Sequence, residues 1–249
     1  MTEADWLACE NPWDMLEALF TRARSRAASD ERYRQFGIAC CRRLGDVLDV
    51  ADTDALDCLE LHAKSGLCEA LLRARQVRLQ GDRMNNPVTR MPWTYQPVEF
   101  RAAARVFASS AVWSCTRKRD TQAALAYYAA GCAKAHLRAA DRGLEPTTSL
   151  LRELEREPDP TERAAQADLL RDIFGNPFRP VAFSPKWRTS TARAVALQMY
   201  ESRDFSALPI LADALQDAGC DSAHVLDHCR GEGPHVRGCW VVDRVLGKG

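Results

Sequence analysis

The sequence predicts an all-α protein, an irregular helical bundle that is HEAT-like in its C-terminal third. Helix start signals (Asn or Asp before Pro) and stop signals (Gly or Pro) recur from one end of the chain to the other. Between these signals, apolar residues follow the spacing of a buried helix face. The few β-branched runs stand inside helical spacing or beside prolines, so no run indicates a strand. We expect more than half of the chain to be helical, with no sheet of three or more strands.

The N-terminal third contains three expected helices. Asn11-Pro12 supplies an N-cap and a first helical residue for the first of them. The second covers residues 29–48, and the third runs from a cap at Thr53 through residue 72. Residues 80–97 contain three prolines and an Asn-Asn pair, and this composition predicts a loop.

The middle of the chain combines alanine-rich helices with one polar break. Helices are expected at residues 97–116 and 120–142, where alanine favours both helix formation and close helix–helix approach. Residues 143–160 are polar and hold three prolines, which predicts a break. A cap at Asp159 followed by proline starts a helix over residues 160–174, and Gly175 follows its end.

The C-terminal third begins with a proline- and aromatic-rich segment, residues 176–188. Its prolines restrict the chain, and burial of Phe178, Phe183 and Trp187 should fix it in place. All six tryptophans are interpreted as packing anchors and not as stacking platforms for nucleic-acid bases. Three or four short helices are expected next, at about residues 189–203, 206–219, 221–230 and 234–246.

Length and charge limit the domain organisation and the kinds of partner. We expect residues 1–249 to form a single all-helical domain, with a sub-boundary near 143–160 between a bundle (1–145) and a C-terminal helical module (159–249). The chain carries 34 basic and 34 acidic residues, so no net field attracts it to nucleic acid or to a membrane surface. A protein partner is therefore expected, and the sequence does not give the oligomeric state.

The N-terminus and the cysteines indicate the compartment. The first twenty residues are acidic and lack the basic and apolar regions of a signal peptide, and no stretch approaches the length of a membrane span. Ten cysteines without an export signal predict a cytoplasmic protein whose thiols are free or metal-bound. Cys40 and Cys41 are neighbours, and neighbouring cysteines rarely reach the geometry of a mutual disulfide.

The strongest candidate for chemistry is a metal site built from cysteine and histidine. All five histidines have a cysteine or another histidine four residues away, the spacing that places two ligands on one face of a helix. Thiolate and imidazole together favour zinc. The pairs are most dense near the C-terminus, where the candidate ligands are Cys220, His224, His228, Cys229, His235 and Cys239. The alternative is that these residues are packing, since cysteine is often a buried apolar residue and no known zinc spacing is matched.

Weaker metal and anion sites also remain open. Cys58/His62 and Cys132/His136 repeat the four-residue spacing on other helices. In the tail, Arg230, His235 and Arg237 surround a Gly-Glu-Gly-Pro turn at a helix start, where backbone N–H groups can bind an anion. The alternative for the tail is a tight helix connection whose following residues, Trp240 among them, fill the core.

Three stretches of the sequence resemble an uncharacterised family of bacterial proteins. They are MTEADWLAC at the N-terminus, Phe-x-x-x-Cys-Cys-Arg-Arg at residues 36–43, and the C-terminal phrases RDIFGNPFRPVAF, LPILADALQDAGCD and HCRGEGPHVRGCWVVDRVLG. The resemblance covers residues 1–50 and 171–249, and it implies that the tail is a module of its own. The family has no assigned activity, so the resemblance implies no catalytic residues.

Three functions remain open at this point. The sequence contains no Gly-rich phosphate loop, no Cys-x-x-Cys, no His-Glu-x-x-His and no Gly-x-Ser-x-Gly, which favours a helical interaction or regulatory module without a cofactor. A zinc- or thiol-dependent protein that uses the C-terminal cluster is the second hypothesis. The third is an enzyme whose site lies between helices and carries no local motif, so its catalytic residues are unknown.

Overall fold

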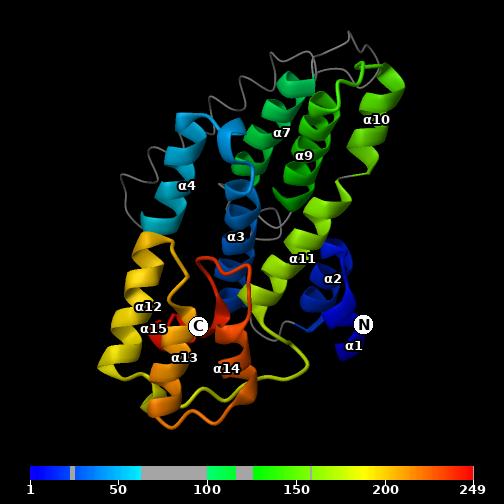
Figure 1. Ribbon diagram of the computed structural model, residues 1–249. Coiled ribbons are helices and arrows are strands. Elements are labelled where there is room, and N and C mark those ends of the chain that lie inside the picture. Colours follow the sequence, from blue (N-terminus) through cyan, green and yellow to red (C-terminus); the bar gives the residue numbers. More distant parts are fainter. Residues whose placement is uncertain (23–25, 63–99, 116–125, 158, 249) are drawn as a thin grey trace. The chain divides into compact units, whose positions relative to one another are not determined.

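The structure is a computed structural model that describes residues 1–22, 26–62, 100–115, 126–157 and 159–248. Within these ranges the chain forms twelve α-helices, two short 3-10 helices and no strand (Figure 1). The predicted all-α fold class is confirmed, and its HEAT-like detail stays a prediction. None of the helices in these ranges has the length and apolar character that a bilayer-spanning segment requires. The loop expected at 80–97 lies outside the described residues.

The chain divides into two compact units. The central unit is Ser29–Gln166, and the terminal unit combines Met1–Ala28 with Ala167–Gly249. The division therefore falls inside α11 (Pro160–Phe174), later than the expected sub-boundary at 143–160, and the N-terminal segment joins the C-terminal one.

The central unit is built around two helices rich in buried alanine. Its α7 and α9 pack against each other, and α10 and α4 pack against α9 and α7 respectively. Alanine has no bulk beyond Cβ, so helices that meet through it can approach closely. The elements of this unit are α3 (Arg26–Arg42), η1 (Gly45–Val47), α4 (Val50–His62), α7 (Phe100–Cys115), α9 (Ala126–Asp141), α10 (Thr148–Arg156) and the start of α11.

Helix α10 lies inside the stretch expected to be a break. Thr147 caps its start by accepting a hydrogen bond from Leu150 N–H at 3.2 Å. Leu151 is buried, and Leu150 and Leu154 pack partly beside it against a cluster that includes Phe100. The expectation of a break over all of 143–160 was wrong because the prolines and Gly143 lie outside these turns, which form an amphipathic helix.

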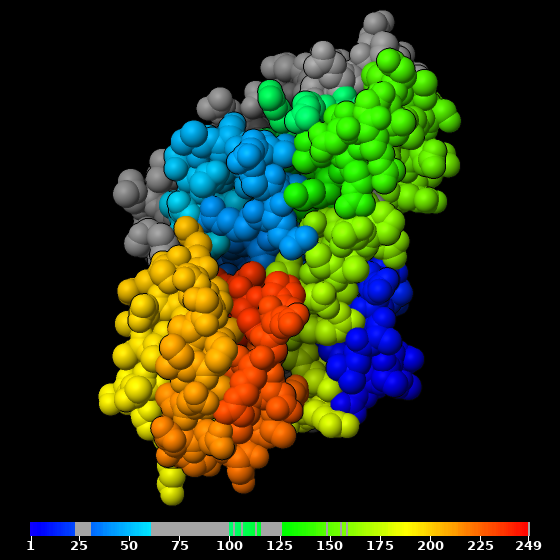
Figure 2. All heavy atoms as spheres, viewed as in Figure 1, coloured from blue at the N-terminus to red at the C-terminus, as the bar shows by residue number. Residues whose placement is uncertain are grey.

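The terminal unit contains the C-terminal helices and the two N-terminal ones. Figure 2 shows the atoms of α12, α13 and α14 side by side on one face of this unit, and α13, in the middle, contacts both of the others. Its core includes Trp187, Met199, Leu211, Cys229 and Val241, all at most 8% exposed. The elements of this unit are α1 (Glu3–Ala8), α2 (Pro12–Arg22), the end of α11, η2 (Pro185–Trp187), α12 (Ser190–Ser202), α13 (Leu208–Asp217), α14 (Ala223–Arg230) and α15 (Trp240–Leu246).

Several boundaries follow the predicted local signals. Helix α2 begins at Pro12, and Asn11 Oδ1 accepts a hydrogen bond from Trp13 N–H. Helix α11 begins at Pro160, and Asp159 Oδ1 accepts from Glu162 N–H at 2.9 Å. These side chains bond N–H groups that have no partner inside the first turn of a helix. Gly175 follows α11 with φ +68°, the left-handed conformation that favours glycine.

The aromatic residues that were predicted to be buried are buried only in part. Trp187 is buried, whereas Phe178 and Phe183 are half-buried. Trp6 and Trp240 are buried as expected, but Trp13 is 52% exposed and is not a packing anchor. Trp93 lies outside the described residues, as do the side-chain surroundings of Trp113.

Candidate metal centre

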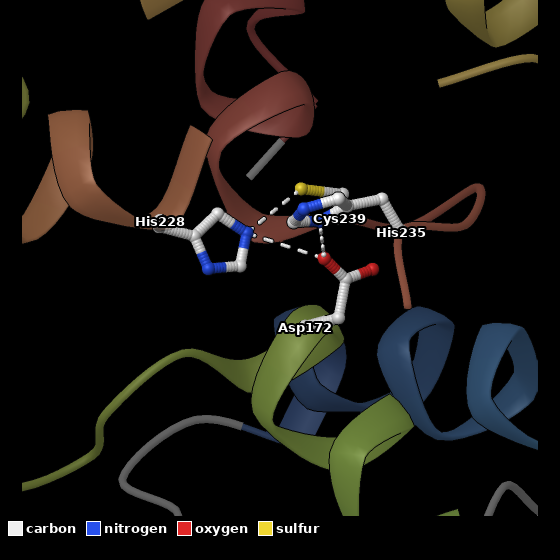
Figure 3. A group of neighbouring side chains, drawn as sticks. All are labelled: Asp172, His228, His235 and Cys239. Carbon is white, nitrogen blue, oxygen red and sulfur yellow. Dashed lines mark hydrogen bonds and ion pairs between the residues drawn. The ribbon is translucent and has the colours of Figure 1, made fainter. Parts of the chain in front are cut away.

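Four side chains converge on one point in the terminal unit: Asp172, His228, His235 and Cys239 (Figure 3). One ligand atom from each lies within 4.8 Å of all the others. Asp172 comes from the last turn of α11, His228 from α14, His235 from the loop between α14 and α15, and Cys239 from the residue before α15. Segments that are distant in the sequence thus contribute one donor each.

Glycines shape the loop that carries His235. Gly233 has φ +88°, and a Cβ at this position would lie 2.9 Å from His235 N and 3.0 Å from its ring. Only glycine combines this backbone conformation with so close an approach. Gly238, at φ +95°, makes a second turn directly before Cys239. The loop therefore replaces the first part of the helix expected at 234–246, and α15 begins only at Trp240.

Three of the distances between donor atoms are somewhat shorter than those of a tetrahedral zinc site. His228 Nε2 lies 3.2 Å from Cys239 Sγ and 3.2 Å from Asp172 Oδ1, and His235 Nδ1 lies 2.8 Å from Asp172 Oδ1. Zinc–ligand bonds of about 2.0–2.3 Å place the ligand atoms of a tetrahedron roughly 3.3–3.8 Å apart. Small outward shifts of these side chains make room for one ion among them.

The arrangement differs from a Cys-His-Asp catalytic triad. In a triad the nucleophile and the carboxylate bond to different nitrogens of the imidazole, so that the carboxylate orients the base. Here Cys239 Sγ and Asp172 Oδ1 both approach His228 Nε2 (Figure 3). This convergence is compatible both with ligands around a shared cation and with one imidazole N–H shared between two acceptors.

Further hydrogen bonds hold the donors in position. Asp172 Oδ2 accepts from Val236 N–H at 3.0 Å, which leaves Oδ1 turned toward the histidines. His235 Nε2 lies 3.3 Å from Gly231 O, so a ring that binds a metal through Nδ1 has a carbonyl ready to accept its other N–H. Metal-binding histidines usually have such a partner.

Burial and charge shift the pKa values of these groups. Burial by itself raises the pKa of Asp172, but hydrogen bonds with His228 and His235 outweigh it and leave the pKa below its usual range. Burial likewise opposes protonation of His235, yet the hydrogen bond to Asp172 raises the pKa of this histidine. Burial raises the pKa of the Cys239 thiol well above its usual range. Burial therefore favours the protonated thiol, whereas a bound cation would favour the thiolate, because a metal-coordinating thiol is deprotonated.

Three of the six predicted donors belong to this centre. His228, His235 and Cys239 come together, and Asp172 joins them, whereas Cys220, His224 and Cys229 lie outside the group. Cys220 and Cys229 are buried in the apolar core, and burial raises the pKa of Cys229 to about 12. The ring of His224 packs 5.1 Å from that of Trp240. The prediction of bound metal itself stays a prediction.

The other two cysteine–histidine pairs have different partners. Cys58 is disulfide-bonded, so it has no thiolate to offer, and the expectation that all thiols are free or metal-bound was wrong at this residue. His136 Nδ1 lies 2.8 Å from the carbonyl oxygen of Cys132, and its ring packs against Phe100 and Phe107. The eight other cysteines among the described residues form no disulfide bond.

The basic residues of the tail are engaged in contacts that fit the helix-connection alternative. Arg230 pairs with Asp213 and also donates to Gln216. Arg237 is buried and donates to the carbonyl oxygens of Tyr200 and Glu201 at the end of α12. These bonds fasten the tail within the unit and leave its guanidinium groups committed to protein partners.

A cavity of about 400 Å³ lies beside the centre. His228 and Trp240 line it together with α1 and the end of α11. Within its wall, Glu3 accepts a hydrogen bond from Asn176 and pairs with Arg179. Behind Trp240, a Cβ on Gly175 would lie 3.2 Å from the indole, so glycine allows this ring to pack against the end of α11.

Asp172 is the donor that sequence reasoning missed. Aspartate is common on helix surfaces, and this residue stands 56 positions before His228 with no cysteine or histidine at helical spacing. The only local hint is its place in a last turn, where an acidic side chain opposes the helix dipole. No protein-family model, no curated protein and no solved structure matches this chain.

Proposed function

We propose that the terminal unit is a zinc-binding helical module in which Asp172, His228, His235 and Cys239 hold one Zn²⁺ ion. The observation that carries the proposal is the approach of Cys239 Sγ and Asp172 Oδ1 to the same nitrogen of His228, at 3.2 Å each. One thiolate, two imidazoles and a carboxylate form a donor set that suits zinc better than the harder cations Mg²⁺ and Ca²⁺.

The centre has a structural role in this proposal. Structural zinc sites use four protein ligands and are closed, whereas catalytic sites keep a position open for water. Four donors converge here, and the side chains of Asp172, His228 and His235 are 2%, 16% and 10% exposed. The ion joins α14, the following loop and α15 to the end of α11, and so contributes to the folding of the unit.

A non-catalytic helical module is the function that this role supports for the protein. We expect the module to act by binding another protein, since the chain has balanced charge and lacks the catalytic motifs sought in it. Thiol chemistry at Cys239, which lies near His228, is less well supported. A nucleophilic cysteine needs access and a lowered pKa, whereas Cys239 is fully buried and burial raises the pKa of its thiol.

Elemental analysis tests the proposal directly. The full chain is purified without a chelator or a metal-affinity tag, supplied with Zn²⁺ and passed through a desalting column before metal and protein are quantified. We expect about one zinc per chain for the parent and a content near zero for Cys239→Ser and His228→Ala, since each change leaves three donors.

Two matched variants control for general damage to the unit. Cys229→Ser removes another buried thiol, and His224→Ala removes the histidine one turn before His228, but neither residue belongs to the four donors. Both should keep zinc. Cobalt substitution supplies a second readout, because a thiolate-to-cobalt absorption band should appear in the parent and disappear in Cys239→Ser. A parent chain with far less than one metal ion after loading would refute the proposal.

A further inference from the structure

Two cysteine side chains face each other inside the central unit. Cys41, on α3, and Cys115, at the end of α7, lie 74 residues apart in the sequence, and their Sγ atoms are 3.7 Å apart. Both residues are fully buried. This contact concerns different residues from the zinc centre and does not depend on the proposal made for it.

The sulfur atoms are already in van der Waals contact. A disulfide bond is about 2.05 Å long, so the two atoms need to approach by roughly 1.7 Å to form one. Cys40, next to Cys41, is also fully buried. Cys40 and Cys41 are adjacent in the chain, which disfavours a bond between them and leaves Cys115 as the better partner for Cys41.

The surroundings of this pair favour redox chemistry over metal binding. The one group of potential metal ligands found among the described residues lies in the terminal unit and includes neither cysteine. Burial raises the pKa of Cys41 well above its usual range, so the thiol stays protonated in the folded unit.

We propose that Cys41 and Cys115 are a redox-active dithiol that oxidises to a disulfide joining α3 to α7. A small-molecule disulfide such as oxidised glutathione is the oxidant. When local opening of the unit exposes one cysteine to water, that cysteine ionises, and its thiolate attacks a glutathione sulfur, forms a mixed disulfide and releases one glutathione thiolate. The other cysteine then attacks the protein sulfur of the mixed disulfide and releases the second. The two thiol protons pass to the two glutathione molecules, so that two cysteines are oxidised and one glutathione disulfide is reduced.

Burial sets the conditions of this reaction. The oxidant reaches the pair only when the unit opens locally or before it has folded, so oxidation of the folded protein is slow. The disulfide, once enclosed, is protected from reductants for the same reason. The cross-link restricts the unfolded chain between α3 and α7, and oxidation should therefore raise the melting temperature of the central unit.

Peptide mapping tests the proposal on the full chain. The reduced protein is oxidised with glutathione disulfide in two ways, in the folded state over many hours and during refolding from denaturant. Free thiols are then blocked with N-ethylmaleimide, and the disulfides are identified by mass spectrometry. We expect a peptide pair that joins Cys41 to Cys115 in both samples, forming faster during refolding, and a higher melting temperature for the oxidised protein.

Variants separate this pair from the other thiols. Cys115→Ser and Cys115→Ala should both abolish the peptide pair and the rise in melting temperature on oxidation. Cys132→Ser should keep both, since Cys132 is an equally buried helical thiol of the same unit. The proposal is overturned if Cys41 and Cys115 carry maleimide after both oxidation protocols, or if Cys41 is found bonded to a different cysteine.

Discussion

The two units place buried cysteines in opposite chemical settings. In the terminal unit, Cys239 Sγ lies 3.2 Å from an imidazole nitrogen that also approaches a carboxylate. In the central unit, Cys41 Sγ lies 3.7 Å from a second thiol. Burial raises the pKa of both Cys239 and Cys41, so burial alone does not distinguish them. Their neighbours distinguish the two cysteines. Nitrogen and oxygen donors beside Cys239 favour binding of a cation, whereas a second thiol beside Cys41 favours oxidation to a disulfide.

Metal removal should produce the largest difference between the units. We expect a strong chelator to lower the melting temperature of the terminal unit by many degrees, because structural zinc contributes its binding free energy to folding. Trp240 reports on the change, since its ring lies 5.3 Å from that of His228. Tryptophan fluorescence and near-ultraviolet circular dichroism, recorded during chelation, are the measurements.

Thiol labelling makes this first test specific to one unit. Maleimide should modify Cys239 much faster after chelation, whereas Cys41 and Cys115 should remain equally slow with and without the chelator. Cys9, which is only partly buried, serves as the reference for the intrinsic labelling rate. Equal acceleration at all three buried cysteines would mean that chelation unfolds both units and that its effect is not confined to the terminal unit.

Loss of one buried charge on α11 should have the next largest effect on the stability of the terminal unit. Asp172→Asn removes a buried carboxylate that accepts from Val236 N–H and faces two histidines. Breaking a buried charged network of this kind costs about 3–5 kcal/mol, and the variant should also bind less zinc. Urea unfolding of the zinc-loaded protein measures the free-energy change.

Asp168→Asn is the matched control, one turn earlier on the same helix. Asp168 is half exposed and pairs with Arg171, so its loss should cost less than about 1 kcal/mol. A similar loss of stability in both variants would show that Asp172 contributes no more to folding than the exposed Asp168. A large loss for Asp172→Asn with unchanged zinc content would remove this carboxylate from the donor set.

Local signals explain which parts of the fold could be predicted from the sequence. The Asp159 cap and Gly175 act within a few residues of the helix ends that they define, so α11 was placed correctly. The start of α15 was wrong because residues 235 and 236 bond to Asp172, more than sixty positions away. Helix α10 was missed because its apolar residues lie in a polar, proline-flanked stretch.

The candidate site was predictable only in part, for a similar reason. His228, His235 and Cys239 stood out because cysteine and histidine are rare and were clustered. Neither the spacing nor the residue type marks Asp172, and only the folded chain brings it to the histidines. Likewise, nothing in the sequence pairs Cys41 with Cys115, because their contact depends on how α3 meets α7.

The smallest expected difference in stability between the units concerns two glycines that follow helices. Gly175 in the terminal unit and Gly143 in the central unit both follow a helix, with φ +68° and +65°. Alanine is strained in this conformation by about 1–2 kcal/mol at either position. A Cβ at Gly143 would meet no atom within 4 Å, whereas one at Gly175 would lie 3.2–3.3 Å from the indole of Trp240.

The difference in unfolding free energy between Gly175→Ala and Gly143→Ala therefore measures the effect of the added Cβ on the indole of Trp240. We expect Gly175→Ala to cost roughly 1 kcal/mol more, because overpacking adds to the backbone strain that both variants share. Urea unfolding of each variant gives this difference, and the emission of Trp240 should shift only in Gly175→Ala. Equal costs with unchanged emission would mean that the indole moves aside freely. The indole of Trp240 would then not fix the position of the His228 ring, and the four proposed donors would be held by their hydrogen bonds to one another, to Val236 and to Gly231.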